Sequence, residues 1–287
     1  MVEWKERMDS VKMKNLQEIF EVDKPIIGMV HLIPLPGAPG YDFYGMDAII
    51  EKALTDAKAL EEGGVDGLMV ENMWDHPYYV GEDVPPEEMT AQAVAAREVI
   101  KNTNLPTGIN VIHNGGKVTL SIAVASGAKF IRICLLAGAR VWDTGEFDHG
   151  CAAELLRLRK HLGAEHIKIF ADVDKKHSVP FPGIDLETHI LWTERYLADA
   201  LIVSGKLTGW APELEKVKKA KEFAGNTPVL IGSGTTAANV KDFLKYADGI
   251  IVGTDLKKDG VNENPVDVSR VKKYMRAVKM ARKNMKK

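Results

Sequence analysis

Two stretches near the C-terminus decide the fold: Pro228-Val-Leu-Ile-Gly-Ser-Gly-Thr-Thr236 and Ala247-Asp-Gly-Ile-Ile-Val-Gly-Thr-Asp255. Each contains a short apolar run, residues 229–231 and 250–252, followed directly by a turn of glycine, serine or threonine. Continuous apolar runs without alternation are typical of strands covered on both faces, as in parallel sheets. Because residues 237–245 between them have a helical pattern, the pair predicts a β–α–β unit.

The two turns also predict a phosphate site. Small residues allow backbone N–H groups to approach an anion, and a following helix N-terminus adds a favourable partial charge. No Lys or Arg lies between Leu230 and Val240, so we expect neutral donors to bind the dianion. The candidate residues are Gly232, Ser233, Gly234, Thr235, Gly253 and Thr254. The alternative is that these glycines only make tight turns.

The rest of the chain alternates between strand-like and helix-like runs. Six further apolar runs predict strands at residues 26–32, 68–72, 107–113, 130–134, 167–173 and 200–203. Eight strand–helix units favour a closed (β/α)8 TIM barrel of the phosphate-binding type over an open doubly wound sheet. No GxGxxG follows the first strand, so a dinucleotide-binding fold loses its main support. We expect one domain over residues 1–287. It comprises a helical extension (1–22) packed on the barrel's N-terminal end and a barrel (25–287).

Composition excludes several classes of protein. The 45% hydrophobic and 27% charged residues, with a net charge of −2, are those of a globular protein without a basic field for nucleic acid. Two cysteines, Cys134 and Cys151, argue against a disulfide scaffold. No apolar run reaches the ~20 residues of a membrane span and the N-terminus is charged, so we expect a cytoplasmic protein. Nine Lys/Arg at 270–287 accompany an apolar stripe, which predicts a barrel helix with a solvated basic face.

Polar residues follow most of the predicted strands, where barrel enzymes keep their chemistry. We interpret Asp172 and His177 as an acid–base pair, Glu71 as the alternative base, and Lys176 or Arg132 as stabilisers of negative charge. The candidate substrate-binding residues are His31, Asn72, Asn110, His113, Asn114 and Ser204. Any one of these side chains could instead be satisfied by a buried partner. The case for a site is their expected convergence on one cavity.

Other chemistries have weaker support. Glu71, Asp172, His31 and His177 could bind a divalent ion, but no fixed-spacing motif backs a metal site, and there is no nicotinamide or flavin signature. A Schiff-base lysine is disfavoured, because Lys168 starts its strand and Lys206 lies in a loop. The segment 73–88, rich in aromatics and carboxylates, is long enough to be a lid or a static cap.

Ordered blocks of sequence resemble the BtpA/SgcQ family from about Lys24 to the C-terminus. They are Gly28-Met-Val-His-Leu32 with Pro34-Leu-Pro-Gly37, Val70-Glu-Asn72, Phe130-Ile-Arg132, Ala171-Asp-Val173 with Lys176-His177, Ile202-Val-Ser-Gly205 with Thr208-Gly209, Ile231-Gly-Ser-Gly-Thr235, and Ile251-Val-Gly-Thr254 with Asp259-Gly260 and Asn264-Pro-Val-Asp267. The resemblance implies a phosphate-binding TIM barrel. The family is named for a cyanobacterial member needed to accumulate photosystem I. The resemblance implies no defined reaction. This chain departs from the family with His113-Asn114-Gly115 where Arg-Asn-Asp is expected, and with Cys134 where Asn is usual.

These observations predict an enzyme that acts on a small phosphorylated metabolite, sugar- or nucleoside-derived, as an isomerase or a lyase of aldolase type. The competing hypothesis is a non-catalytic BtpA-like biogenesis or assembly factor, because one fold hosts many functions. A polar strand-end cavity favours the enzyme, and an apolar exterior patch favours the assembly factor. A homo-oligomer is compatible with the sequence, which does not fix the oligomeric state.

Overall fold

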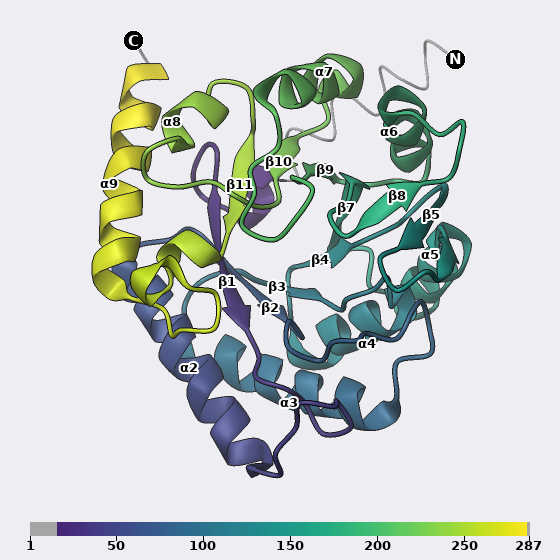
Figure 1. Cartoon of the computed structure of the whole chain (residues 1–287), viewed down its shortest axis with the longest axis vertical. Helices are drawn as coiled ribbons and strands as arrows, with labels where there is room; N and C mark the ends of the chain where they lie inside the picture. The colour runs from purple at the N-terminus through teal and green to yellow at the C-terminus, as the bar shows by residue number, and fades with distance from the viewer. Residues whose placement is uncertain (1–15, 286–287) are drawn as a thin grey trace.

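Parallel strands close into a barrel in the computed structural model, which describes residues 16–285 (Figure 1). Around the barrel the strand order is β1-β11-β10-β9-β7-β4-β3-β2, and every neighbouring pair is parallel. The bounds are β1 (Ile26–His31), β2 (Gly67–Glu71), β3 (Thr107–Asn110), β4 (Phe130–Ile133), β7 (Lys168–Asp174), β9 (Ala200–Val203), β10 (Val229–Ile231) and β11 (Gly249–Val252). The predicted TIM-barrel fold is confirmed.

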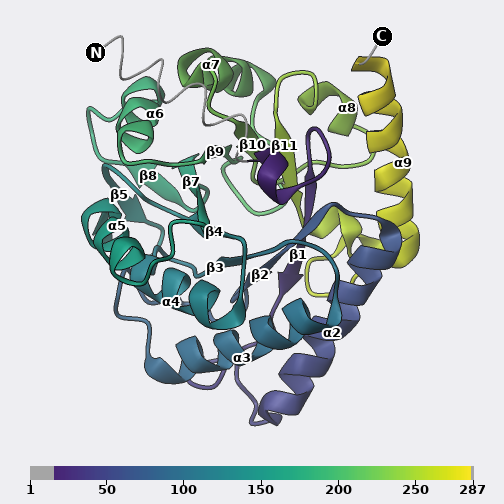
Figure 2. The ribbon, with the colours of Figure 1, turned by 180° about the vertical axis from the view of Figure 1, so that it is seen from behind.

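Helices surround the barrel on its outer face (Figure 1, Figure 2). They are α2 (Gly45–Gly63), α3 (Pro86–Asn102), α4 (Gly116–Ser126), α5 (Ala152–His161), α6 (Leu186–Arg195), α7 (Leu214–Ala224), α8 (Val240–Phe243) and α9 (Val268–Met285), with 3-10 turns η1 (Thr254–Leu256) and η2 (Lys258–Gly260). Asp185 caps α6, since its Oδ1 accepts from the N–H of Thr188 at 2.8 Å. The apolar stripe of α9 is buried against the barrel. None of the helices within 16–285 could cross a membrane.

Two helices begin later than the sequence pattern predicts. The Oδ1 of Asn239 accepts from the N–H of Thr236 at 2.7 Å, so a side-chain turn replaces the first turn of the helix expected at 237–245. The sequence at 211–213 places a proline at an acceptable first-turn position and predicts a helix start there, which is wrong, because Glu213 is an extended cap and α7 starts at Leu214.

A small antiparallel sheet lies beside the barrel and was not predicted. It consists of β5 (Ala139–Trp142), β6 (Phe147–His149) and β8 (Ser178–Pro180), in the order β6-β5-β8. The first two strands belong to the segment after β4 and the third to the segment after β7. Such short strands have little periodicity, and β8 reaches β5 only because the barrel places the two segments side by side.

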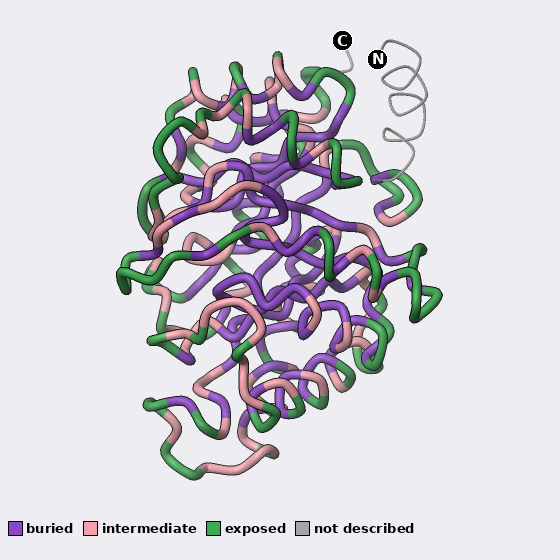
Figure 3. Tube along the Cα trace, turned by 90° about the vertical axis from the view of Figure 1, so that its right-hand side faces the viewer, coloured by how far each residue is buried: buried purple, intermediate pink, exposed green. Residues whose placement is uncertain are grey.

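The core has two parts because inward- and outward-facing residues alternate along each strand. One cluster lies between the strands and the helices, and its members include Ala57, Val99 and Val278. The other fills the barrel interior, with Phe130 and Phe170 among its members. In Figure 3 the buried trace is concentrated in the central strands and the exposed trace in the outer turns.

The N-terminal extension reaches the bottom of the barrel. Residues 16–19 are helical, and Leu16 and Phe20 are buried within the interior cluster, where the ring of Phe20 lies 5.5 Å from that of Phe130. The described part of the extension therefore packs on the barrel's N-terminal end, as predicted. Residues 1–15 of the predicted extension lie outside the described residues.

Candidate active site

A ring of small and polar residues tops the barrel interior. The interior residues Met69, Phe130 and Phe170 are each followed two positions later by a polar residue on the same face of the strand. The resulting ring, one residue from each strand end, is His31, Glu71, Asn110, Arg132, Asp172, Ser204, Gly232 and Gly253. All eight are among the residues that the sequence predicted. Four of them also lie in register on adjacent strands, in the order His31, Glu71, Asn110, Arg132.

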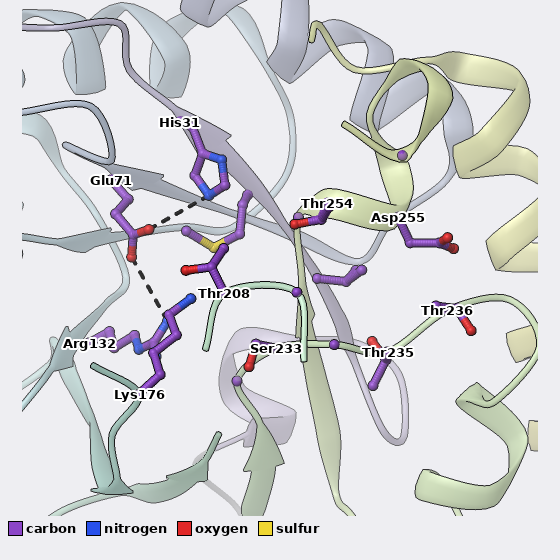
Figure 4. A pocket seen from close by; sticks show the side chains of 17 residues that line it. His31, Glu71, Arg132, Lys176, Thr208, Ser233, Thr235, Thr236, Thr254 and Asp255 are labelled. Carbon is purple, nitrogen blue, oxygen red and sulfur yellow. Dashed lines mark ion pairs between the residues drawn. The ribbon is translucent and has the colours of Figure 1, made fainter. Parts of the chain in front are cut away.

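Glu71 is the centre of the polar contacts in this ring. Its Oε1 lies 3.6 Å from His31 Nε2 and its Oε2 lies 3.9 Å from an Nη atom of Arg132 (Figure 4). Asn110 donates a short hydrogen bond from Nδ2 to the same Oε2. Burial alone would raise the pKa of Glu71, but the charge of Arg132 together with those of Lys176 and Lys175 outweighs it and holds the pKa below its ordinary value. Glu71 is therefore an ionised carboxylate.

Asp172 is bound to Arg132 from below the pocket. Arg132 donates from Nε and Nη2 to the two carboxylate oxygens at 2.9 and 3.0 Å, and Ser204 Oγ lies 3.4 Å from Oδ1. Lys175 Nζ is 3.8 Å from Oδ2. Asp172 is fully buried and does not line the pocket. Its role in this geometry is to hold the guanidinium in place, which differs from the predicted acid–base role.

One cavity of about 220 Å³ opens above this ring. On one side it is lined by the side chains of Glu71, His31, Arg132 and Lys176, which face the turns after β10 and β11 (Figure 4). Burial lowers the pKa of His31 to about 3, and the charge of Lys257 adds to this lowering, so the imidazole is neutral. Three cations, Arg132, Lys176 and the buried Lys175, lie near the carboxylates of Glu71 and Asp172. A third carboxylate that lines the cavity, Asp255, is paired with Arg270 at 3.2 Å. This excess of positive charge suits an anionic ligand.

Glycines open the cavity on the side of β10 and β11. A Cβ on Gly232 would lie 2.4 Å from Ser204 Oγ, and one on Gly253 would lie 3.0 Å from the ring of His31. Both positions belong to the ring of inward-facing residues, so any larger side chain would reduce the space above Arg132 and His31. These two glycines therefore have a spatial role as well as a role in the turns.

Backbone N–H groups in the two turns are free to bind a ligand. Within 16–285, those of Ser233, Gly234, Thr235 and Gly253 donate to no other residue, and all four residues line the cavity. Unpaired N–H groups around a cavity are suited to an anion. The helix expected to assist them contributes little, because α8 has four residues and the N–H of Ala237 already donates to Asp255 at 3.0 Å.

The predicted hydroxyl donors are used within the protein. Ser233 Oγ donates to the carbonyl of Trp210 at 3.1 Å, and Thr235 Oγ1 is 2.8 Å from the hydroxyl of Tyr274 on α9. Thr254 Oγ1 donates to Asn262 at 3.3 Å. These side chains hold the turns in position, so the N–H groups remain the main anion donors.

His177 lies at the rim and away from Asp172. Its φ of 59° turns the chain after β7, and its Nδ1 lies 3.1 Å from Asp143 and its Nε2 3.0 Å from Thr208. No hydrogen bond or ion pair joins His177 to Asp172 within the described part of the chain. The predicted pair of His177 and Asp172 is therefore not formed. The partner of His177 is Asp143, which follows β5 of the small sheet that was not predicted.

Three predicted substrate-binding residues are enclosed elsewhere. Asn72 accepts from the N–H of Ile112 at 2.9 Å, and Asn114 accepts from that of Leu135 at 2.9 Å. His113 is buried, with its ring stacked 4.1 Å from that of Trp142. Burial lowers the pKa of His113 to about 3. The departure from the family pattern therefore places a neutral aromatic ring beside the pocket rather than a charge in it.

The long segment after β2 does not line the cavity. Residues 73–85 are tied to the next loop, since the N–H of Gly81 donates to the carbonyl of His113 at 2.9 Å and Tyr78 packs on the His113 ring. Glu82 accepts from the N–H of Lys117 at 2.9 Å. These contacts favour the static cap over the lid.

Several pocket residues were not predicted. They are Met29, Thr208, Gly209, Val252, Asp255 and Gly260. Thr208 and Gly209 belong to a block that resembles the family, and their segment after β9 reaches the cavity because it packs on the turn at Gly234. A Cβ at Gly234, whose φ is 75°, would lie 1.9 Å from the N atom of Ala211.

The four potential metal ligands do not converge. Glu71 and His31 are neighbours, whereas Asp172 is paired with Arg132 and His177 with Asp143. Over 16–285 no group of three or more His, Cys, Asp or Glu side chains could hold a metal ion.

Comparison with known proteins gives consistent matches at the level of family and fold. The model of the BtpA family matches residues 22–280. An uncharacterized protein of Thermococcus kodakarensis is 46% identical over 264 residues, which cover 91% of this chain and 97% of that protein. The photosystem I biogenesis protein BtpA of Synechocystis is 38% identical, covering 92% and 91%. The structure of N-(5'-phosphoribosyl)anthranilate isomerase from Pyrococcus furiosus covers 90% of this chain and 99% of its own, with a TM-score of 0.54 and 16% identity.

Proposed function

This chain belongs to the BtpA family, and we propose that it is an enzyme acting on a small phosphorylated, sugar- or nucleoside-derived metabolite. The reaction class is isomerisation or an aldolase-type lyase step. The observation that carries the proposal is one cavity with unpaired N–H groups on one side and Glu71, Arg132 and Lys176 on the other. A ligand bound by its phosphate at the two turns would present its carbon chain to these side chains.

The acid–base role falls to Glu71 in this proposal. It is ionised and lines the cavity, and Asn110 and Arg132 fix its orientation, so it is suited to take a proton from a carbon or hydroxyl of the ligand. Arg132 and Lys176 would stabilise the negative charge that develops on the ligand oxygen. The neutral His31 would contribute a hydrogen bond at Glu71 Oε1, whereas Arg132 lies nearer Oε2.

The phosphate would be bound chiefly by the N–H groups of Ser233, Gly234, Thr235 and Gly253. Hydrogen bonds from neutral N–H groups to an anion are shorter and about twice as strong as neutral–neutral ones, so several of them suffice without a dedicated cation. The likeness to N-(5'-phosphoribosyl)anthranilate isomerase supports the fold alone, but the name of that enzyme includes a phosphorylated substrate, which is the ligand class proposed here.

A thermal-shift screen tests the proposal. Phosphorylated metabolites are compared with their dephosphorylated counterparts, with and without divalent ions. A ligand present at 100 times its Kd stabilises by about 2.7 kcal/mol. With an unfolding entropy of ~2.1 cal/mol/K per residue, this raises Tm by roughly 4–5 °C. The variant Lys176→Met should reduce the shift, whereas Lys279→Met, which removes an exposed cation on α9, should not. Equal shifts with dephosphorylated compounds would refute the phosphate site.

An assembly factor is the second candidate, and a surface feature favours it. Phe147, Val179 and Phe181 are exposed on and beside the small sheet, and the rings of Phe147 and Phe181 lie 6.0 Å apart. The name of the Synechocystis relative describes such a biogenesis role. If the double variant Phe147→Ser with Phe181→Ser abolished a biogenesis role in cells while the ligand-induced shifts in Tm were unchanged, this second candidate would be favoured over the enzyme.

A further inference from the structure

Lys176, which lines the cavity, differs in its contacts from the nearby Lys175 and Lys206. Lys175 is buried and lies 3.8 Å from the carboxylate of Asp172, and Lys206 is exposed. Lys176 lines the cavity, and its amine forms no hydrogen bond or ion pair within residues 16–285 (Figure 4). An amine without a partner inside a cavity is available to react with what enters it.

The backbone holds Lys176 in this position. It follows β7 closely, and the next residue, His177, has a φ of 59°. The N–H of His177 donates to the carbonyl of Lys206 at 3.2 Å, while its ring contacts Asp143 and Thr208. The turn is therefore fixed on both sides, and the lysine side chain extends from it toward Glu71 and Arg132.

The charges around Lys176 also favour its neutral form. Burial lowers the pKa of Lys176 to about 8; Glu71 opposes this shift, and Arg132 and Lys175 add to it. A lysine in this range carries an appreciable fraction of free amine near neutral pH, and the free amine is the nucleophile. Neither Lys168, which lies 3.1 Å from Glu18, nor the exposed Lys206 has this combination of environment and position.

We propose that Lys176 forms a Schiff base with the carbonyl carbon of a phosphorylated aldehyde or ketone bound in the cavity. This inference rests on the proposed function, and it names the substrate class as a carbonyl compound carrying a phosphate. The site divides accordingly: the turns after β10 and β11 take the phosphate, and Lys176 takes the carbonyl.

The step is balanced through Glu71. Lys176 first gives one proton from its ammonium to the Glu71 carboxylate, and the neutral nitrogen attacks the carbonyl carbon to form the C–N bond. A second amine proton moves to the carbonyl oxygen, which becomes the hydroxyl of a carbinolamine. The C–O bond then breaks, the nitrogen lone pair forms C=N⁺, and the proton on Glu71 returns to the leaving hydroxide to give water. Ammonium and carbonyl thus yield iminium and water, without an oxidant or a further reactant.

Reductive trapping tests this inference directly. The protein is incubated with D-glyceraldehyde 3-phosphate, dihydroxyacetone phosphate or D-ribose 5-phosphate and sodium cyanoborohydride, which adds hydride to the imine carbon. Peptide mass spectrometry then locates the secondary amine. At least one compound should label Lys176 tenfold or more above Lys175 and Lys206. Inorganic phosphate should suppress this labelling, and unphosphorylated glyceraldehyde should give little of it.

Two variants separate the imine from a simple charge effect. Lys176→Arg keeps the positive charge but cannot form an imine, so it should retain the thermal shift with inorganic phosphate and lose all labelling at this position. Lys206→Arg should change neither. Labelling of the wild type should rise as the pH increases through about 8, because the free amine replaces the ammonium.

The outcomes distinguish the two proposals. If phosphorylated compounds shift Tm but Lys176 is labelled no more than Lys206, the Schiff base is overturned and the phosphate site stands. If neither shift nor labelling occurs with any of the three compounds, both proposals are overturned.

Discussion

Replacing Asp172 by Asn should destabilise the barrel strongly, because it leaves the buried Arg132 guanidinium without its main partner. Asp172 accepts from Arg132 at 2.9 and 3.0 Å, and the other carboxylate near Arg132, that of Glu71, lies 3.9 Å away. Breaking a buried ion pair by removing one partner costs about 3–5 kcal/mol. With an unfolding entropy of ~2.1 cal/mol/K per residue, this lowers Tm by about 5–8 °C.

Urea denaturation and thermal unfolding of Asp172→Asn measure this effect, with Asp242→Asn as the control. Asp242 pairs with Lys245 at 2.9 Å on the surface, and exposed pairs are worth about 0–1 kcal/mol. Combining Asp172→Leu with Arg132→Met should recover only part of the lost stability. Apolar residues of similar size can replace both partners of a buried pair, but Glu71 and Lys175 then lose their contacts with Arg132 and Asp172. The result that refutes the reasoning is an equal Tm for the two Asn variants.

The pH dependence has a definite sign. Burial alone would raise the pKa of Asp172, but Arg132 holds it below the ordinary value of 3.8. A carboxylate with a lowered folded pKa stabilises the protein above its unfolded pKa, and this contribution is lost as the pH falls toward the folded value. The stability difference between the wild type and Asp172→Asn should therefore be full at neutral pH and decrease below about pH 4.

Two further predictions concern the glycines and the histidines of the site. Gly234→Ala should lower both Tm and phosphate binding, because its Cβ would collide with the backbone N of Ala211. Gly253→Ala, whose Cβ meets the ring of His31 at 3.0 Å, should weaken phosphate binding in calorimetry with a smaller loss of Tm. Equal losses of Tm for the two variants would contradict the assignment. His31 and His113, each with a pKa lowered to about 3 by burial, should show ¹⁵N ring shifts of neutral imidazole from pH 8 down to pH 5, and titration of either near pH 6.5 would contradict its burial.

Gly234 illustrates the limit of a local pattern. Its place in the predicted phosphate-binding turn suggests that a bulky residue there would occupy the space of the anion. In the structure its φ is positive, but a Cβ would point at the backbone of Trp210 and Ala211 rather than into the cavity. A variant at Gly234 therefore tests the packing of two loops together with the site, and Gly253 is the better position for testing the site alone.

The sequence alone determined the barrel and the ring of residues above its core. Wholly apolar runs at regular spacing identify strands that are buried on both faces, and period-two alternation then places Glu71, Arg132 and Asp172 on the same inward face as the core residues two positions earlier. These are properties of a single strand and its immediate neighbours in the chain, so a linear pattern contains them.

The partnerships within the site were decided only by the tertiary structure. Asp172 was expected to work with His177, five residues away, but it binds Arg132 from another strand, while His177 pairs with Asp143 beside a sheet of strands too short to predict. The small sheet, the packing of the segment after β9 on Gly234 and the isolation of the Lys176 amine all depend on segments distant in sequence. Such contacts, and the desolvation that lowers the pKa of Lys176, arise from which groups the closed barrel encloses together, and no local pattern records that.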